Sequence, residues 1–245
     1  MLMKYKLILF IIIFFTIYKI NKILKNIIYV DHDIVYDTGG YYGFYQLGIC
    51  HYIKNNFNYL NKKSIGISAG SWLSLFMSLD KEHTPFFLKS LFSNIDYICP
   101  IQKMPQLFKN TIYNLNCNDS INIKNMNILV TDLNNLKMVI HNNFLSLQDA
   151  MNCCTASSFV PFITYNDLFY FYKHTSCMDG GLLKKVCFKL KHPEKTLVIK
   201  YKMFGRYAKY KPLKPFIKPK RSLYELYLLG YHDASKNHDY LQKYF

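Results

Sequence analysis

Hydrophobic positions along the chain fall into short apolar runs, separated by polar stretches that contain glycine, proline, asparagine or lysine. Short runs rich in Ile, Val, Leu and aromatic residues predict strands, and they occupy 33–37, 65–67, 126–131, 137–141, 169–172 and 196–201. Apolar residues at helical spacing, or on most sides of a segment, predict helices, and they occupy 45–53, 72–79, 147–158 and 222–245. We therefore expect strands and helices to alternate along most of the chain.

Two long stretches follow neither pattern. Between 79 and 125, polar and aromatic residues are mixed and three prolines interrupt any long helix, so we expect short helices and loops that would form a lid over a lipid site. The segment 184–221 contains 14 Lys or Arg residues and a single acidic residue, and its second half is rich in proline. Such a segment suits either an anionic lipid surface or a solvated basic loop.

The N-terminal region has the pattern of a membrane anchor. Residues 7–18 form an uncharged apolar run of 12 residues with lysines on both sides. As a helix this run would cover about 18 Å, short of a hydrocarbon core of about 30 Å, although flanking lysines can snorkel. No small-residue cleavage site follows, so we predict an uncleaved anchor and amphipathic linker over 1–30. An amphipathic helix in the membrane plane is the alternative, and the orientation stays open.

The size and charge of the chain limit the possible number of domains and the possible partners. The chain has 245 residues, so 31–245 fits one large domain. Its net charge of +16 favours an anionic partner, either an acidic membrane or a nucleic acid, although a genome rich in A and T would also produce such a composition. Seven cysteines without Cys-x-x-Cys or zinc-ligand spacing indicate reduced thiols facing a reducing compartment, and no metal site.

A glycine-rich turn follows the first predicted strand of this domain. Thr38-Gly39-Gly40-Tyr41-Tyr42-Gly43 leads directly into a helical pattern, and such a turn directs free backbone N–H groups at an anion. The turn lacks the glycine spacing and the acidic residue of a dinucleotide site, and no P-loop Gly-Lys-Ser/Thr follows. We therefore expect no cofactor. The turn can supply an oxyanion hole through the N–H groups of Gly39, Gly40 and Tyr41, with Gly43 as a turn glycine; an ordinary turn that needs glycine for a positive φ is the alternative.

The segment Gly66-Ile67-Ser68-Ala69-Gly70 contains the Gly-x-Ser-x-Gly pattern of a nucleophile elbow. In an elbow the serine occupies a sharp turn between a strand and a helix, so that its hydroxyl oxygen projects from the backbone. A β-carbon at 66 or 70 would collide with the neighbouring backbone of that turn. Ser68 is therefore the candidate nucleophile, and it needs a base within about 3 Å.

A third motif supplies a candidate base. Asp179-Gly180-Gly181 follows the aromatic strand-like stretch, and by itself Asp-Gly-Gly indicates a turn. The order and spacing of the three motifs resemble the patatin-like phospholipase family. So do Ala156-Ser157-Ser158-Phe159-Val160-Pro161 and the closing Leu229-Gly230-Tyr231-His232-Asp233-Ala234. The resemblance covers about 33–234 and implies a three-layer α/β/α sandwich with a Ser68–Asp179 dyad and no catalytic histidine.

The resemblance also implies an activity, namely a membrane-associated lipid acyl hydrolase of the phospholipase A or lysophospholipase type. A catalytically silent, membrane-tethered binding protein and a triacylglycerol lipase or transacylase are the alternatives. The chain departs from the family at Thr38, Tyr42, Lys185 and Cys187, which leaves the nucleophile, the base and their glycines in place. A Ser-His-Asp hydrolase using His192 or His232 is a rival mechanism. A nucleic-acid binder is a further rival, although no RNA-binding module is recognisable.

Overall fold

The structure is a computed structural model that describes residues 12, 16, 19, 26–95, 99–115, 121–211 and 214–245. The predicted anchor over 7–18 lies almost entirely outside these residues. No helix within the described residues is long and apolar enough to cross a membrane. Residues 28–30, assigned from the sequence to the linker, form strand β1 (Ile28–Val30), which pairs in parallel with β8 (Phe188–Leu190). Strand β1 therefore lies within the segment predicted as the linker.

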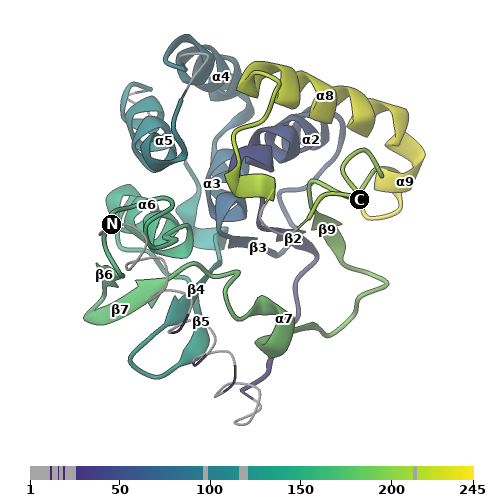
Figure 1. The fold of residues 1–245 in the computed structure, drawn as a ribbon. Helices are drawn as coiled ribbons and strands as arrows, with labels where there is room; N and C mark the ends of the chain where they lie inside the picture. The colour runs from purple at the N-terminus through teal and green to yellow at the C-terminus, as the bar shows by residue number, and fades with distance from the viewer. Residues whose placement is uncertain are drawn as a thin grey trace.

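The main sheet has seven strands and is mostly parallel at its centre (Figure 1). Its strands are β2 (Ile34–Tyr36), β3 (Ser64–Ile67), β4 (Ile128–Asp132), β5 (Lys137–His141), β6 (Tyr170–Tyr172), β7 (Thr175–Met178) and β9 (Leu197–Ile199). Strand β2 is parallel to both β3 and β9, and β3 is parallel to β4. Strands β5 and β7 are antiparallel to β4, and β6 is antiparallel to β7. All the predicted strands are present: β5 has the predicted bounds, β3 is one residue longer, and the others are one to three residues shorter.

Helices cover both faces of the sheet, but unequally. The larger hydrophobic core lies between one face and the helices α2 (Gly43–Asn56), α3 (Ala69–Ser78), α6 (Leu147–Ser157) and α8 (Leu223–Lys236). The smaller core contains Val35, Ile65, Ile67 and Leu129 from the opposite face, packed against Leu183 and Cys187 beside α7 (Lys184–Cys187). Alternation along β2 and β4 therefore divides their side chains between the two cores, as expected for a sheet buried on both faces. The mixed α/β class is confirmed, and the layering is compatible with an α/β/α sandwich.

The stretch 79–125 contains short helices, as predicted. They are α4 (Thr84–Ser93) and α5 (Met104–Tyr113), with the 3-10 turns η2 (Lys81–His83), η3 (Ile101–Lys103) and η5 (Ile123–Asn125). Pro85 and Pro105 lie in the first turn of α4 and α5, respectively. Proline is favoured there because its fixed φ suits the helix and the first amides need no partner within it. The prolines thus start these helices, whereas the sequence suggested only that they interrupt them.

The C-terminal helix packs closely on α2. A β-carbon added to Gly48 would lie 2.0 Å from the Tyr227 carbonyl oxygen, and one added to Gly230 would lie 1.8 Å from that of Tyr45. These two glycines let the backbones of α2 and α8 approach each other closely. A Ser222–Glu225 capping box begins α8 at the predicted position. The predicted helix over 222–245 is interrupted near Asn237, and α9 (His238–Gln242) follows.

Candidate active site

Strand register brings Ser68 and Asp179 to the same point of the sheet. Strand β5 pairs along all of β4 on one side, so β3 and β7 share its other side. Parallel β3 ends with Ile67 opposite Leu129, and antiparallel β7 ends with Met178 opposite Thr131. The residues that follow these two strand ends therefore meet beside Val130 from opposite directions. They are Ser68 and Asp179, separated by more than a hundred positions in the sequence.

Ser68 adopts the backbone conformation expected of a nucleophile elbow. It lies between β3 and α3 with φ 56° and ψ −124°, a conformation that L-residues rarely adopt and that costs of order 1–3 kcal/mol. A β-carbon at Gly66 would lie 2.6 Å from the Gly70 carbonyl oxygen, and one at Gly70 would lie 2.0 Å from that of Tyr36. The predicted steric reason for both glycines is thus confirmed, and the surrounding turn holds Ser68 in its strained conformation.

Three hydrogen bonds hold Asp179 in place. Its amide donates to the Phe159 carbonyl at 2.8 Å, and its carbonyl accepts from Thr131 Oγ1 at 2.8 Å. Its Oδ1 accepts from the Gly181 amide at 2.7 Å. A β-carbon at Gly180 would lie 2.1 Å from the Leu129 carbonyl oxygen, so this glycine is needed for the turn to pack against β4.

The Asp179 carboxyl is poised to gain or lose a proton near neutral pH. Only 7% of the residue is exposed, and burial raises the pKa of its carboxyl to about 7. Hydrogen bonds from the Ser68 side chain and the Gly181 amide oppose this rise in pKa. The second oxygen, Oδ2, is buried and has no hydrogen-bond partner within the described residues. A carboxylate with one unsatisfied oxygen beside a serine hydroxyl has the proton-accepting capacity that a general base requires.

Ser157 is a supporting residue that the sequence did not identify. Its hydroxyl donates to the Leu129 carbonyl at 2.7 Å and accepts from the Ser68 amide at 2.9 Å. Its own carbonyl accepts from the Gly180 amide at 2.9 Å. Ser157 therefore connects the elbow, β4 and the Asp179 turn. In the sequence, Ser157 is marked only as part of Ala156–Pro161, a segment that carries the family resemblance. Its residue type gives no indication of a bridging role.

The glycine-rich turn lies next to the elbow. Gly40 has φ +50° and lines the same cavity as Ser68, in the 3-10 turn η1 (Gly40–Tyr42). A β-carbon on Gly43 would lie 3.0 Å from that of Ala69, the residue after Ser68. Gly39 and Tyr41 flank Gly40 but do not line the cavity. Ala69 does line it and is the first residue of α3, whose initial amides have no partner within the helix, so its N–H group is a donor that the sequence analysis missed.

An apolar cavity of about 60 Å³ opens at Ser68. Phe44, Trp72 and Leu73 line it from α2 and α3, and Ile101, Met104 and Phe108 line it from η3 and α5. Phe216, in the 3-10 turn η6 (Lys214–Phe216), lines another part. Residues of the predicted lid region thus form one wall. The cavity suits a hydrocarbon segment, and its small volume requires lining side chains to move before a long chain can enter.

No described histidine lines this cavity. His192 pairs with Glu194 at 3.9 Å and is about half exposed, and His232 is exposed on α8. The partly buried His51 hydrogen-bonds the hydroxyl of Tyr227 at 2.6 Å. The described part of the chain therefore offers Ser68 a carboxylate partner and no imidazole.

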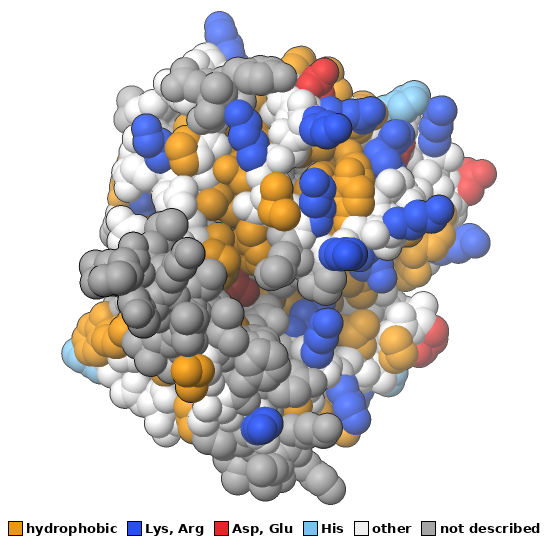
Figure 2. All heavy atoms as spheres, viewed as in Figure 1, with side chains coloured by type: hydrophobic (Ala, Val, Ile, Leu, Met, Phe, Trp, Pro, Cys, Tyr) orange, Lys and Arg blue, Asp and Glu red, His pale blue; other side chains and the backbone are white. Residues whose placement is uncertain are grey.

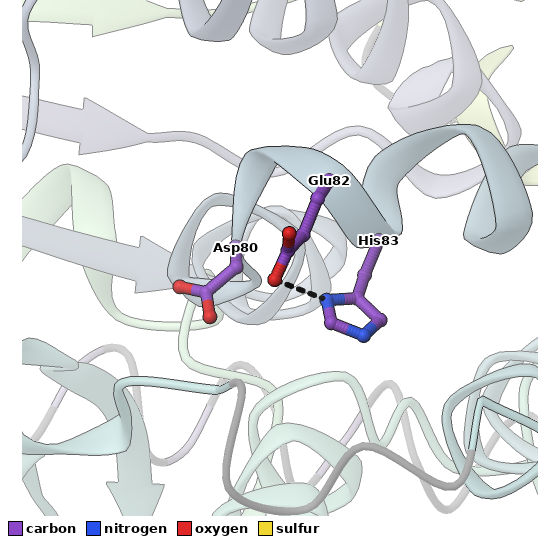
Figure 3. Close-up of side chains that lie close together, drawn as sticks. All are labelled: Asp80, Glu82 and His83. Carbon is purple, nitrogen blue, oxygen red and sulfur yellow. Dashed lines mark ion pairs between the residues drawn. The ribbon is translucent and has the colours of Figure 1, made fainter.

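One group of potential metal ligands occurs elsewhere in the described residues. Asp80, Glu82 and His83 follow the C-terminal end of α3, with one ligand atom of each within 4.8 Å of the others (Figure 3). The Glu82 carboxylate is 3.9 Å from His83 Nδ1, and both acidic residues are exposed. This group lies at the opposite end of α3 from Ser68. It contributes nothing to the candidate site.

Several cations of the basic segment 184–221 are already paired. Lys184 contacts Asp37, and Lys191 contacts Asp31 at 3.1 Å. Arg206 donates to both carboxylate oxygens of Asp233, at 2.5 and 2.6 Å. The segment is therefore not one continuous basic surface, as its composition alone suggested. In the face seen in Figure 2, several Lys and Arg side chains surround a patch of hydrophobic side chains.

Comparison of the chain with models of known protein families and with curated proteins gave no match. The chemical case therefore depends on the geometry. A strained serine, a buried carboxyl that titrates near pH 7, two adjacent turns with backbone N–H donors and an apolar cavity meet at one point. Such a set of groups can transfer an acyl group to a serine.

Proposed function

We propose that the protein is a membrane-associated lipid acyl hydrolase of the patatin-like phospholipase type, which cleaves carboxylic esters with a Ser68–Asp179 dyad. The observation that carries the proposal is the placement of the strained Ser68 beside the buried carboxyl of Asp179, whose Oδ2 has no hydrogen-bond partner within the described residues, at the mouth of an apolar cavity. The resemblance of the three motifs to that family supports the same activity. We propose no metal or cofactor.

In this mechanism the Ser68 oxygen attacks the ester carbonyl carbon while its proton passes to Asp179. The negative charge that develops on the carbonyl oxygen is stabilised by N–H groups of the 39–41 turn and of Ala69, each worth about 3 kcal/mol of barrier. The carbon–oxygen bond to the alcohol then breaks, and the alcohol leaves with the proton from Asp179. Water adds to the acyl-enzyme, gives a proton to Asp179, and releases the acid as Ser68 regains its hydrogen.

The substrate class follows from the shape and polarity of the cavity. Its walls are mostly Phe, Trp, Leu, Ile and Met side chains, which favour an acyl chain over a polar group. Ser158, Val160 and Thr164 form its more polar side. A phospholipid or lysophospholipid would place its acyl chain against the apolar walls and its headgroup toward the solvent.

The rim near Phe216 suits contact with an anionic membrane. Ile217 is 55% exposed beside this cavity-lining residue, and Lys214, Lys218, Lys220 and Arg221 lie within a few positions of it. Basic residues near an anionic surface each contribute about 1 kcal/mol of attraction. An N-terminal anchor would act in addition to this rim. We therefore infer that the catalytic domain works at a membrane, in contact with a reducing compartment.

The test uses vesicles that contain mixed phospholipids and triacylglycerol. We expect the protein to release fatty acids and lysolipids, identified by mass spectrometry, and Ser68→Ala to release none. Ser93→Ala, which changes an exposed serine of α4, is the matched control and should retain full activity. Triacylglycerol as the preferred substrate would indicate a lipase, and acyl transfer to added alcohols a transacylase. Absence of turnover by folded protein would favour the silent binding protein.

A further inference from the structure

An ion pair between Lys184 and Asp37 lies next to the Ser68–Asp179 pair. Asp37 is the first residue after β2, and Lys184 begins α7, shortly after the Asp179 turn. The Lys184 ammonium contacts Asp37 Oδ1, and the two side chains are only 23% and 13% exposed, respectively. The Thr38 amide donates to the same oxygen at 2.6 Å. The pair is thus largely shielded from water, so its charges act strongly on neighbouring groups.

The turn that holds Asp37 touches the turn that holds Asp179. A β-carbon at Gly181 would lie 2.5 Å from the Thr38 methyl group and 2.9 Å from Asp179 Oδ1. Gly181 therefore lies between Thr38 and the Asp179 carboxyl, with no side chain to separate them. Through this contact the Asp37 charge favours the protonated form of Asp179, since two neighbouring negative charges repel each other.

The other titratable groups at this point do not replace Lys184. Tyr201, just after β9, feels the Asp37 charge and is neutral near pH 7, because burial raises the pKa of its phenol above 10. The Asp132 carboxylate at the end of β4 accepts hydrogen bonds from Asn134 and Asn135. Within the described residues, Lys184 is the cation paired with Asp37. The Lys184–Asp37 pair carries no net charge at the point where the Asp37 turn touches the Asp179 turn.

We propose that Lys184 is a positioning residue which, by neutralising Asp37, lets Asp179 exist as a carboxylate and so sets the pH range in which Ser68 reacts. This inference rests on the proposed Ser68–Asp179 chemistry. Without the ammonium group, Asp37 places an uncompensated negative charge beside the base. Asp179 then loses its proton at a higher pH, and the reaction of Ser68 requires that higher pH as well.

The experiment measures the rate of Ser68 phosphonylation by a fluorophosphonate as a function of pH. We expect the acid limb of this profile to move up by about one pH unit in Lys184→Met, which slows the reaction about tenfold on the acidic side. Lys184→Arg retains the positive charge and should follow the wild-type profile. Lys185→Met is the matched control, because it removes the same charge from the adjacent, exposed position and should leave the profile unchanged.

The opposite substitution gives a prediction of opposite sign. Asp37→Asn removes the negative charge and retains an oxygen for the Thr38 amide, so the acid limb should move to lower pH. The double variant Asp37→Asn/Lys184→Met is neutral at both positions, as the intact pair is in sum, and should return close to the wild-type profile. An ion pair with only a structural role would lower the melting temperature of these variants without moving the limb, and that result would overturn the proposal.

A second measurement does not depend on catalysis. Protein labelled with carbon-13 at the aspartate carboxyl carbons allows Asp179 to be titrated by NMR, with Asp179→Asn to assign its signal. In a Ser68→Ala background, Lys184→Met should raise the Asp179 midpoint by about one pH unit. If Ser68 reacts in no variant, the proposed function fails, and this titration still decides the coupling. Equal midpoints with and without Lys184 would refute it.

Discussion

Two aspartates of this protein are equally buried and have opposite surroundings. Asp179 and Asp233 are each 7% exposed. Burial tends to raise the pKa of Asp233 too, but two hydrogen bonds from Arg206 and one from the Tyr45 hydroxyl at 2.7 Å lower it below its usual value. No cation within the described residues is bonded to Asp179, and burial raises the pKa of its carboxyl to about 7. Divergent environments of this kind separate a structural carboxylate from a reactive one.

The difference between the two aspartates predicts its largest effect on catalytic activity. Asp179→Asn removes the base, so ester hydrolysis should fall by about a thousandfold or more, measured with a soluble ester. Asp233→Asn should retain most of the activity per folded molecule, because Asp233 joins α8 to Arg206 and lies outside the cavity. Histidine variants, including His192→Ala and His232→Ala, should remain active. Equal losses of activity in Asp179→Asn and Asp233→Asn would contradict the distinction between a reactive and a structural carboxylate.

The next effect is on stability, and its sign should reverse between the two residues. Asp233→Asn leaves Arg206 partly buried without its anion, which should cost about 3 kcal/mol of unfolding free energy. Asp179→Asn removes a buried carboxylate that opposes folding, so at pH 8 it should stabilise the protein by about 1–4 kcal/mol. Urea unfolding monitored by circular dichroism measures both changes. Destabilisation by Asp179→Asn at pH 8 would show that its hydrogen bonds contribute more than its burial costs.

The pKa shifts of Asp179 and Asp233 predict that the contributions of these two residues to stability depend on pH in opposite ways. The folded-state pKa of Asp179, about 7, lies above its unfolded value of about 4. Its contribution to stability therefore decreases as pH rises from 4 to 7, while the base form needed for activity increases. The folded-state pKa of Asp233 is lowered, so its contribution is present above about pH 4 and is lost on acidification. We expect hydrolysis to rise about tenfold per pH unit below 7 and then level off, with no such rise in stability.

The smallest expected effect concerns the membrane rim. Ile217→Asp places a charge where we expect an apolar side chain to enter the lipid, and it should weaken binding to anionic vesicles about tenfold. Hydrolysis of a soluble ester should change little. Leu145→Asp is the matched control, because Leu145 is 91% exposed and does not line the cavity. Similar vesicle binding by wild-type and Ile217→Asp proteins, measured by sedimentation in a Ser68→Ala background, would exclude this rim.

The sequence predicted the parts of the site that depend on local geometry. Gly-x-Ser-x-Gly placed Ser68 at a strand–helix turn because only glycine fits at 66 and 70, and the short apolar runs located the strands. It could not predict Ser157, because nothing local distinguishes a serine that bridges two turns from a neighbour such as Ser158. The ion pair between Lys184 and Asp37 could not be predicted for the same reason, because only the folding of the sheet brings these two residues together.

Composition was the least reliable guide. The basic segment suggested one surface for acidic lipids, yet Lys184 and Arg206 are held by buried or partly buried carboxylates. Charge counts treat every lysine and arginine alike, whereas burial decides which of them reach a ligand. The sequence predicted a lid within 79–125 but not which of its residues line the cavity, because these reach the Ser68 region only through contacts such as that of Phe108 with Trp72.

The central claim is that the Ser68 hydroxyl is activated by the Asp179 carboxylate. Its most direct test is mass spectrometry of the folded protein after reaction with a fluorophosphonate at pH 8, comparing wild type with Asp179→Asn. We predict one adduct per chain in the wild type, located on Ser68, and no measurable adduct in the variant. Labelling of Asp179→Asn at the wild-type rate, or an adduct on another residue, would contradict it.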